Sequence, residues 1–262
     1  MEKPEVFSEK KDLITTITLN RPERKNAVRY QTLLLIAKEM AMAADDEETR
    51  VVVLTGVPGA FSAGADLKEG MEGDEPVERM MELTTRAAQR IITWMVTMPK
   101  PVITKVDGPA VGFGCNLALA GDIVIASERV RFSEIFVKVG LATDGGGAFI
   151  LPRLVGLRKA FELVLTGEFV EGKKAEEIGL ATRVVPVADL DRVVDELAHK
   201  LARGPRRAMA ATKAAIYRGL HGNMMEVLEM ETKAQINAVR NGEFTEGAMA
   251  FMQRRDPDFR DI

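Results

Sequence analysis

The chain has 262 residues, of which 46% are hydrophobic and 29% are charged, a balance typical of one large compact domain with or without an appendage. Its formal net charge is −3 and no block of lysines or arginines stands out, so we expect no nucleic-acid partner. A single cysteine excludes an intrachain disulfide framework, and no apolar signal segment or long apolar run occurs, so we expect a cytoplasmic protein without membrane contact.

Short apolar strands alternate with helices over the first part of the chain. The segment "LITTITLN" alternates apolar and polar residues as a half-buried strand does, and three apolar runs end in turn residues: "VVVLTG", "PVITKVDG" and "DIVIAS". Helical periodicity predicts helices over residues 28–44 and 77–96. This recurrence of strand, loop and helix indicates an α/β fold.

From Asp189 onward the pattern is purely helical, and glycine, proline and asparagine separate the helical segments. We therefore divide the chain into an α/β core over residues 1–200 and a C-terminal helical region over residues 201–262. A helical region that follows an α/β core often serves as a lid or as an oligomer contact.

Two glycine-rich loops each follow a predicted strand and precede a helix: "GVPGAFSAGADLKEG" over residues 56–70 and "GPAVGFGC" over residues 108–115. Small residues let the backbone approach a ligand, and free N–H groups at a helix start stabilise negative charge. Two such loops can aim two N–H donors at one oxygen and form an oxyanion hole. The alternative is a pair of tight strand-to-helix turns, in which Asp66 caps the next helix.

Other chemistries lack the residues that they need. The second loop has Asn116 and then a leucine where a dinucleotide fingerprint requires its third glycine, and the chain has no P-loop. It has no metal-binding C-x-x-C or H-E-x-x-H motif, and both histidines, His199 and His221, lie in the purely helical stretch after Asp189, which also disfavours a Ser-His-Asp triad. The "LALA" sequence near Cys115 favours a small apolar helix residue over a nucleophile. The type of active site that remains is one in which a carboxylate works together with backbone N–H donors.

Five motifs make the chain recognisable: "ITLNRPERKNAV", "GAFSAGADLKE", "KPVITKVDGPAVGFGCNLALAGDIVIAS", "LPRLVGLRKAFELVLTGE" and "AEEIGLATRVV". In this order and spacing they resemble the crotonase superfamily, the enoyl-CoA hydratase/isomerase family, from about residue 5 to residue 262. The resemblance implies a repeated ββα spiral core with a C-terminal helical trimerisation region. It also implies homotrimers, often paired into hexamers, and no separate cofactor, because coenzyme A is part of the acyl-CoA substrate.

The resemblance further implies that two backbone N–H groups polarise the thioester carbonyl and stabilise an enolate. In this sequence the two donors fall on Ala65 and Phe113. Many family members have glycine at the second position, so we expect the phenyl ring of Phe113 to narrow or redirect the acyl pocket. The substrate-binding residues that the resemblance implies are Lys25, Ala27, Ala63, Asp66, Leu67, Lys68, Gly114, Asn116, Phe136 and Phe251, the last reaching the site of a neighbouring subunit.

The main departure from the family concerns the two glutamates with which its hydratases hold and activate water. Their positions are occupied here by Asn116 and Phe136, and neither side chain can accept a proton near neutral pH. The two-carboxylate route of hydration therefore lacks both of its groups. The nearest acids in the sequence are Glu134 and Asp144.

Asp144 stands directly before three glycines, where a helix is expected to begin, and its ordinary role there is an N-cap. Some isomerases of the superfamily are similar in placing their acid–base carboxylate on this loop. A base in this position requires apolar surroundings that raise its pKa. Glu134 is the alternative acid, since residues two apart, such as Glu134 and Phe136, share a side in extended chain.

A single carboxylate suits double-bond isomerisation, because it can remove a proton next to the thioester and return it further along the chain. The sequence therefore favours an enoyl-CoA isomerase. The alternatives are an enoyl-CoA hydratase, a hydrolase or decarboxylase that uses the same enolate, and a non-catalytic acyl-CoA-binding trimer. Met80, Met81 and Trp94 lie on a predicted helix and are either core residues or pocket-lining residues.

Overall fold

A six-stranded sheet lies at the centre of the structure, a computed structural model that describes residues 4–68, 75–260 and 262. Its neighbouring strands are parallel, apart from the antiparallel pair at one edge formed by β1 and β2. In spatial order the strands are β1 (Val6–Lys11), β2 (Ile14–Leu19), β3 (Val51–Gly56), β4 (Val102–Val106), β6 (Ile123–Ser127) and β9 (Arg183–Val185). The four strands predicted from the sequence are confirmed. The last residues of the first glycine loop, from 69 onward, and the first three residues of the chain lie outside the described residues.

A second, three-stranded sheet contains β5 (Pro109–Val111), β7 (Arg131–Ser133) and β8 (Val170–Glu171). β5 lies inside the segment that the sequence analysis treated as a glycine loop. In two successive repeats a long strand leads to a short one and then to helical structure: β4, β5 and α4 (Phe113–Leu119), then β6, β7 and the short helix η2 (Ile135–Val139). This is the repeated ββα arrangement that the resemblance implied, and the predicted fold is confirmed.

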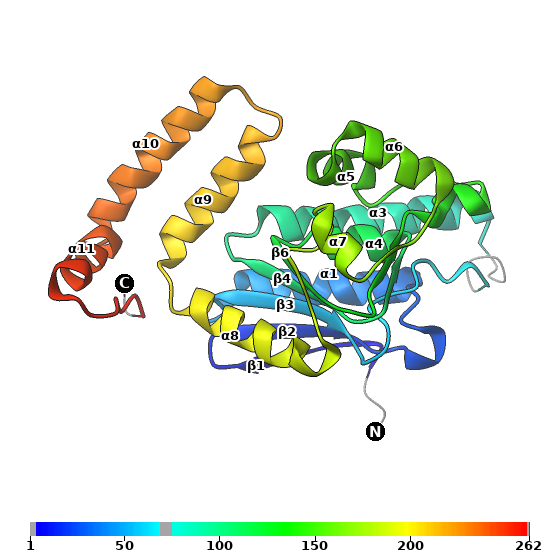
Figure 1. Ribbon diagram of the computed structural model, residues 1–262, viewed down its shortest axis with the longest axis horizontal. Coiled ribbons are helices and arrows are strands. Elements are labelled where there is room, and N and C mark those ends of the chain that lie inside the picture. The colour runs from blue at the N-terminus through cyan, green and yellow to red at the C-terminus, as the bar shows by residue number, and fades with distance from the viewer. Residues whose placement is uncertain (1–3, 69–74, 261) are drawn as a thin grey trace.

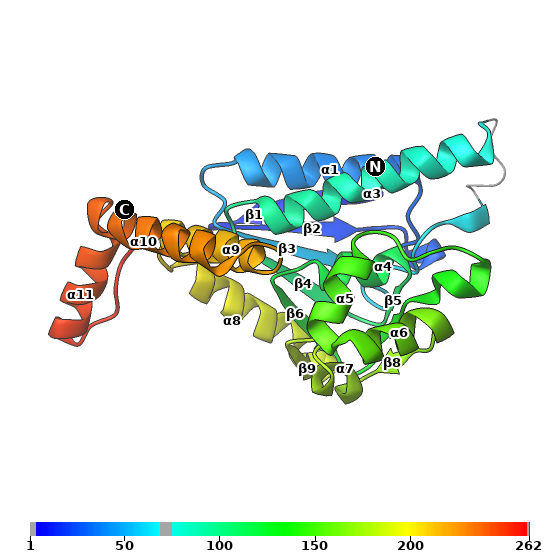
Figure 2. The same cartoon turned by 90° about the horizontal axis from the view of Figure 1, so that it is seen from above.

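Helices cover both faces of the large sheet. On one face α1 (Tyr30–Asp45) and α3 (Val77–Thr97) run side by side, as Figure 2 shows. On the other face lies α8 (Leu190–Ala202). The strands are apolar on both sides because successive side chains point to opposite faces: Val52 and Leu54 join the cluster under α1 and α3, whereas Val51 and Val53 join the cluster under α8.

The segment that leads into α5 (Gly147–Val155) differs from two of the predictions. Residues 135–139 form a 3-10 helix rather than extended chain, so the argument that Glu134 and Phe136 share a side is wrong. The N-cap of α5 is Gly146, so Asp144 is not the N-cap. The other short helices are η1 (Pro22–Arg24), α6 (Leu157–Thr166), α7 (Lys173–Glu177) and η3 (Val187–Asp189).

The last three helices, α9 (Arg206–Gly219), α10 (Met224–Arg240) and α11 (Glu243–Gln253), lie at the left of Figure 1, and the turn between α9 and α10 contacts α5, where Arg153 donates to the backbone carbonyl of Leu220 at 3.2 Å. Other contacts attach these helices to the core. Lys213 on α9 donates to Asp122 at 2.7 Å, and Arg50 donates to the backbone carbonyl of Phe259 at 3.2 Å. Among the described residues, no helix is long and apolar enough to cross a membrane.

Candidate active site

The two glycine-rich loops are hydrogen-bonded to each other at the edge of the small sheet. The backbone N–H of Val111 donates to the carbonyl of Ser62 at 2.9 Å, and the N–H of Ser62 donates to Pro109 at 3.0 Å. The contact leaves no room for side chains: a Cβ atom on Gly64 would lie 2.5 Å from the carbonyl oxygen of Val111, and one on Gly114 would lie 2.4 Å from that of Ser62. Glycine is therefore required on both loops for close packing.

Two backbone N–H groups at this contact are available to a ligand. Ala65 and Phe113 both line the same cavity, and their N–H groups have no hydrogen-bond partner among the described residues. A Cβ atom on Gly64 would lie 3.7 Å from the nitrogen of Phe113, which shows how closely the two loops approach. Phe113 is the first residue of α4, so its N–H lies outside the helical hydrogen-bond ladder. Such a pair of donors can hold an oxyanion.

The cavity beside these donors has a volume of about 450 Å³, and most of its lining is apolar. Its walls come from α1, both glycine loops, the first half of α3, η2 and the loop before α5. This lining suits an apolar acyl chain better than a charged ligand. The apolar side chains of the lining are Val28, Leu33, Ala63, Ala65, Leu67, Val77, Met80, Met81, Ala88, Val111, Phe113, Ile135, Phe136, Val139 and Leu141.

Asp144 brings a carboxyl group to this apolar cavity. Its side chain is partly buried, and its Oδ1 atom is buried without a hydrogen-bond partner among the described residues. Burial raises the pKa of Asp144 to about 6. The residues Gly145 and Gly146, both at positive φ, form the turn into α5 and leave the side chain of Asp144 free of a capping role. The carboxyl group can therefore exchange a proton near neutral pH.

Asp66, the other aspartate of the cavity, differs from Asp144. Its Oδ2 accepts a hydrogen bond from Nη2 of Arg21 at 3.1 Å, and both side chains are at least nine-tenths buried. The ion pair links the first glycine loop to the second residue after β2. Asp66 is thus committed to a structural contact, and we assign the only uncommitted carboxyl group among the described cavity residues to Asp144.

Asn116 and Glu134 lie behind the cavity wall and do not line it. Asn116 is fully buried, and its amide Nδ2 donates to the backbone carbonyl of Asp144 at 2.9 Å and to Oε2 of Glu134 at 3.3 Å. The same Oε2 accepts from the hydroxyl of Thr143 at 2.8 Å. Burial raises the pKa of Glu134, and the hydrogen bonds from Thr143 and Asn116 oppose that rise.

Cys115 precedes Asn116 on α4 and is also buried. Burial raises the pKa of its thiol well above the usual value. The protonated thiol is a weak nucleophile. The structure therefore supports the assignment of Cys115 as a small apolar helix residue. Among the described residues, no three histidine, cysteine or acidic side chains come together as a metal-binding group.

The structure brings part of the predicted substrate-binding set to the cavity. Ala63, Asp66, Leu67 and Phe136 line it together with Ala65, Phe113 and Asp144. Several other predicted residues do not line it. Lys25 is exposed and accepts the N–H of Ala63 at its backbone carbonyl, while Lys68 is exposed next to the cavity wall. The remaining residues that do not line it are Ala27, Gly114 and Asn116, all buried, and Phe251, which is 85% exposed on α11.

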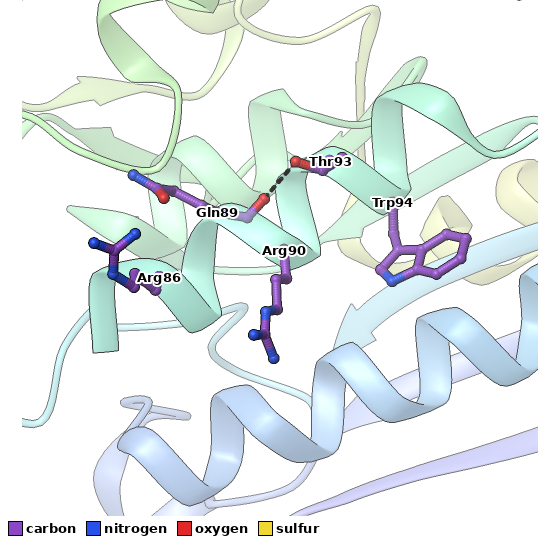
Figure 3. Close-up of a pocket in the computed structure, with 5 residues that line it drawn as sticks. All are labelled: Arg86, Gln89, Arg90, Thr93 and Trp94. Atoms are coloured by element: carbon purple, nitrogen blue, oxygen red, sulfur yellow. Dashed lines mark hydrogen bonds between the residues drawn. The ribbon is translucent and has the colours of Figure 1, made fainter. Parts of the chain in front are cut away.

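Helix α3 has two different surfaces. Met80 and Met81, near its start, line the cavity, whereas Trp94, near its end, does not. Figure 3 shows a separate, open hollow on α3 lined by Arg86, Gln89, Arg90, Thr93 and Trp94. This hollow contains no residue of either glycine loop, and all its lining residues come from one helix. The pocket-lining prediction thus fits Met80 and Met81 but not Trp94.

The sequence analysis missed two residues that shape the site. Arg21 lies two residues after the end of β2 and pairs with Asp66, but a lone arginine in sequence gives no sign of burial. Thr143 is adjacent to Asp144. Its hydroxyl donates to Glu134, nine residues earlier, and no local pattern reveals that contact. Only the helical spacing of Val77, Met80 and Met81 offered a signal for the α3 wall, and core helices share that spacing.

Comparison with known proteins assigns this arrangement to a family. A family model described as "Enoyl-CoA hydratase/isomerase" matches residues 9–262. The trans-2-decenoyl-[acyl-carrier-protein] isomerase of Streptococcus mutans is 31% identical over 249 residues, which cover 94% of each chain. The 1,2-epoxyphenylacetyl-CoA isomerase of Escherichia coli is 34% identical over 247 residues, again 94% of each chain. A crystal structure of enoyl-CoA hydratase from Bacillus anthracis superposes with a TM-score of 0.93 at 30% identity, covering 99% of this chain and 100% of that one. The chain therefore belongs to the enoyl-CoA hydratase/isomerase family of the crotonase superfamily.

Proposed function

We propose that this enzyme moves the carbon–carbon double bond of an enoyl-CoA, with Asp144 as its single acid–base group. The observation that carries the proposal is the environment of Asp144: a cavity-facing carboxyl group without a hydrogen-bond partner for Oδ1 among the described residues, and with a pKa raised to about 6. Asn116 and Phe136 occupy the two positions at which a family hydratase has glutamates. The name of one relative, a trans-2-decenoyl-[acyl-carrier-protein] isomerase, supports this choice, whereas other relatives are named probable enoyl-CoA hydratases.

In the proposed reaction the N–H groups of Ala65 and Phe113 hold the thioester carbonyl oxygen. The carboxylate of Asp144 removes a proton from the carbon next to the carbonyl of a 3-enoyl thioester, and the electron pair delocalises into a dienolate. The carboxylic acid then returns the same proton to the far end of the dienolate, which yields the 2-enoyl thioester. Atoms and charge balance without water, and the apolar side chain of Phe136 helps to keep the cavity dry.

Hydration is the second candidate, because a second carboxyl group, Glu134, lies close to the loop of Asp144 and its Oε1 atom also lacks a partner among the described residues. A hydratase needs both groups to reach the same water molecule. Glu134 does not line the cavity, however, and its Oε2 atom already accepts hydrogen bonds from Thr143 and Asn116. This placement favours the one-carboxylate reaction.

The test is a turnover assay in which the purified protein receives a 3-enoyl-CoA and a 2-enoyl-CoA in parallel. We expect conversion of the 3-enoyl substrate, and a 10²- to 10⁴-fold lower kcat in Asp144→Asn, about the contribution of general acid–base catalysis. A matched control is Asp191→Asn, which changes an 87% exposed aspartate on α8 and is expected to leave kcat unchanged.

Either of two other outcomes would contradict the proposal. Hydration of the 2-enoyl substrate without conversion of the 3-enoyl substrate would identify a hydratase. Tight binding of coenzyme A without turnover of either substrate would identify a non-catalytic binding protein, and release of free coenzyme A or carbon dioxide would identify a hydrolase or a decarboxylase.

We also propose that the C-terminal region, residues 201–262, forms trimer contacts and that Phe251 contributes to the coenzyme A site of a neighbouring subunit. Large apolar side chains are exposed along α10 and α11, which supports an interface there: Met224 is 72% exposed, Phe251 85% and Met252 74%. The single, buried cysteine agrees with a cytoplasmic location. Sedimentation velocity tests the trimer, and the pairing of trimers into hexamers, directly.

A further inference from the structure

Glu134 is a buried carboxyl group that the proposed proton transfer does not use. It is 2% exposed and stands at the junction of β7 and η2, as the residue before Ile135. Burying a carboxyl group costs free energy unless hydrogen bonds compensate it. Its contacts therefore indicate what the group is there to hold.

Those contacts join three segments that are distant in sequence. Oε2 of Glu134 accepts from Nδ2 of Asn116, on α4, and from Oγ1 of Thr143, on the loop before α5. Thr143 immediately precedes Asp144 in the chain. One carboxylate oxygen thus connects the helix that provides an oxyanion donor with the loop that provides the acid–base group.

A second route runs from Glu134 to the same loop. The amide of Asn116 has two N–H hydrogens, and it donates one bond to Glu134 and the other to the backbone carbonyl of Asp144. An acid at residue 116 could not donate both bonds. Glu134 therefore orients the amide group that in turn holds the backbone of Asp144.

The loop itself cannot fix this position without help. Gly145 and Gly146 adopt positive φ, where glycine has the most freedom. The loop lies directly on the hydrogen-bonded groups: a Cβ atom on Gly147 would lie 2.5 Å from Nδ2 of Asn116 and 2.7 Å from Oγ1 of Thr143. The two hydrogen-bond routes hold a segment that its own glycines leave free to move.

We propose that Glu134 is a positioning residue, whose carboxyl group fixes the loop of Asp144 through Thr143 and Asn116 and so aims the Asp144 carboxyl group into the cavity. The proposal rests on the isomerase function above. Misplacing a catalytic group by about 1 Å can lower the rate about 100-fold, so this support has a measurable kinetic effect. Glu134 itself does not line the cavity in which the substrate is proposed to bind, so KM is expected to change little.

The experiment compares two substitutions of Glu134 in the full-length protein, with kcat, KM and Tm measured for each. Glu134→Gln keeps an oxygen acceptor for Thr143 and Asn116, and we expect a kcat within about threefold of the unmodified protein. Glu134→Leu has nearly the same volume but no acceptor. We expect its kcat to fall about 10- to 100-fold, with KM unchanged within about twofold.

A third variant keeps the test decisive if Glu134→Leu does not fold. Thr143→Val removes one of the two routes at a partly exposed site, and we expect a fall in kcat of about 3- to 10-fold without a change in KM. A merely structural role predicts lower Tm values with kcat unchanged at temperatures where the variants are folded. That result, or equal losses of kcat in Glu134→Gln and Glu134→Leu, would overturn the proposal.

Asp144→Asn separates this inference from the proposed function. If Asp144→Asn retains full activity, the isomerase assignment to Asp144 fails and the role of Glu134 fails with it. If Asp144→Asn is inactive while Glu134→Leu and Thr143→Val keep the kcat of the unmodified protein, only the positioning role of Glu134 is wrong.

Discussion

Two aspartates line the same cavity, and their carboxyl groups have opposite surroundings. Asp66, on the first glycine loop, accepts a hydrogen bond from Arg21 within a buried ion pair. Asp144, on the loop before α5, has an oxygen without a partner among the described residues, and its pKa is raised to about 6 by burial alone. The same side chain is thus a structural link in one loop and, in our proposal, the proton acceptor in the other.

The comparison shows that the partner of the carboxyl group, not its place near a ligand, decides its role. The carboxylate of Asp66 is held in an ion pair, whereas the carboxyl group of Asp144, in apolar surroundings, has a raised pKa and retains its proton to higher pH. We expect substitutions of the two residues to separate activity from stability.

The largest expected effect is on activity, in Asp144→Asn. The amide keeps the shape of the side chain but cannot accept a proton, so kcat for isomerisation falls about 10²- to 10⁴-fold. Affinity for coenzyme A, measured by calorimetry, is expected to stay within about twofold because the proposed role of Asp144 is proton transfer in the apolar cavity, not nucleotide binding. A loss of coenzyme A affinity as large as the loss of kcat would show that Asp144 acts through the fold.

The next largest effect is on stability, in Asp66→Asn. The substitution removes a charged hydrogen-bond acceptor from the buried guanidinium of Arg21, which keeps Glu5 at 3.6 Å, so we expect the loss of a hydrogen bond between charged groups, about 1.5–3 kcal/mol. We expect a clearly lower denaturant midpoint. At a temperature where the variant is folded, its kcat is expected to fall far less than that of Asp144→Asn. The two aspartates would have equivalent roles if both variants lost kcat equally.

The sequence predicted β2, β3, β4 and β6, since each is an apolar or alternating run that ends in turn residues, but it missed β1, whose sequence VFSEKK is mostly polar. It missed the small sheet. β5, β7 and β8 have only two or three residues each, too few for any periodicity, and they form only because distant segments pair. The ββα repeat therefore came from the resemblance, although the glycine loops themselves indicated a site.

Within the site, local rules failed at Asp144. An aspartate before a run of glycines at an expected helix start predicts an N-cap, yet Gly146 takes that place. The reason is tertiary: Gly145 packs so closely on the ring of Phe113 that a Cβ atom there would lie 2.8 Å from Cδ2. Contacts of this kind, like the ion pair of Arg21 with Asp66, join segments whose proximity no local pattern reveals.

The pH dependence sharpens the contrast between the two aspartates. Asp144 must be ionised to act as a base, so kcat/KM for isomerisation is expected to rise with pH through a midpoint of about 6. The charged group nearest to its loop is Glu134, whose pKa burial also raises. A profile without a change between pH 5 and pH 7 would exclude Asp144 as the base.

The raised pKa of Asp144 also has a smaller effect, on the stability of the fold. The sign of this effect is opposite to that of a carboxylate held in an ion pair. Because the folded-state pKa of Asp144 is raised from 3.8 to about 6, ionisation destabilises the fold: the cost is absent well below pH 4 and complete above pH 6. Asp144→Asn removes the cost. With an allowance for partial exposure, we expect the variant to gain about 1–2 kcal/mol over the unmodified protein at pH 8. Denaturant unfolding of both proteins at pH 8 and pH 4.5 measures the gain, which should shrink at the lower pH.

The smallest expected effect concerns the ring of Phe113, which supports the loop of Asp144 and lines the cavity at the same time. Phe113→Leu keeps the backbone N–H donor but removes part of the ring, so the cavity widens under that loop. We expect kcat for a short straight-chain substrate to fall by less than about tenfold, and the ratio of kcat/KM values to shift toward a bulkier acyl group, since a methylene group in an apolar pocket contributes about 1–3 kcal/mol.

Phe136→Leu is the matched control, because Phe136 lines the cavity from η2 and does not contact Gly145 in the way that Phe113 does. Phe136→Leu should shift the acyl preference without the loss of kcat. Of the two phenylalanines, only Phe113 both provides a proposed oxyanion-hole N–H group and packs against the loop of Asp144. An equal loss of kcat in both variants would mean that the ring of Phe113 only fills space.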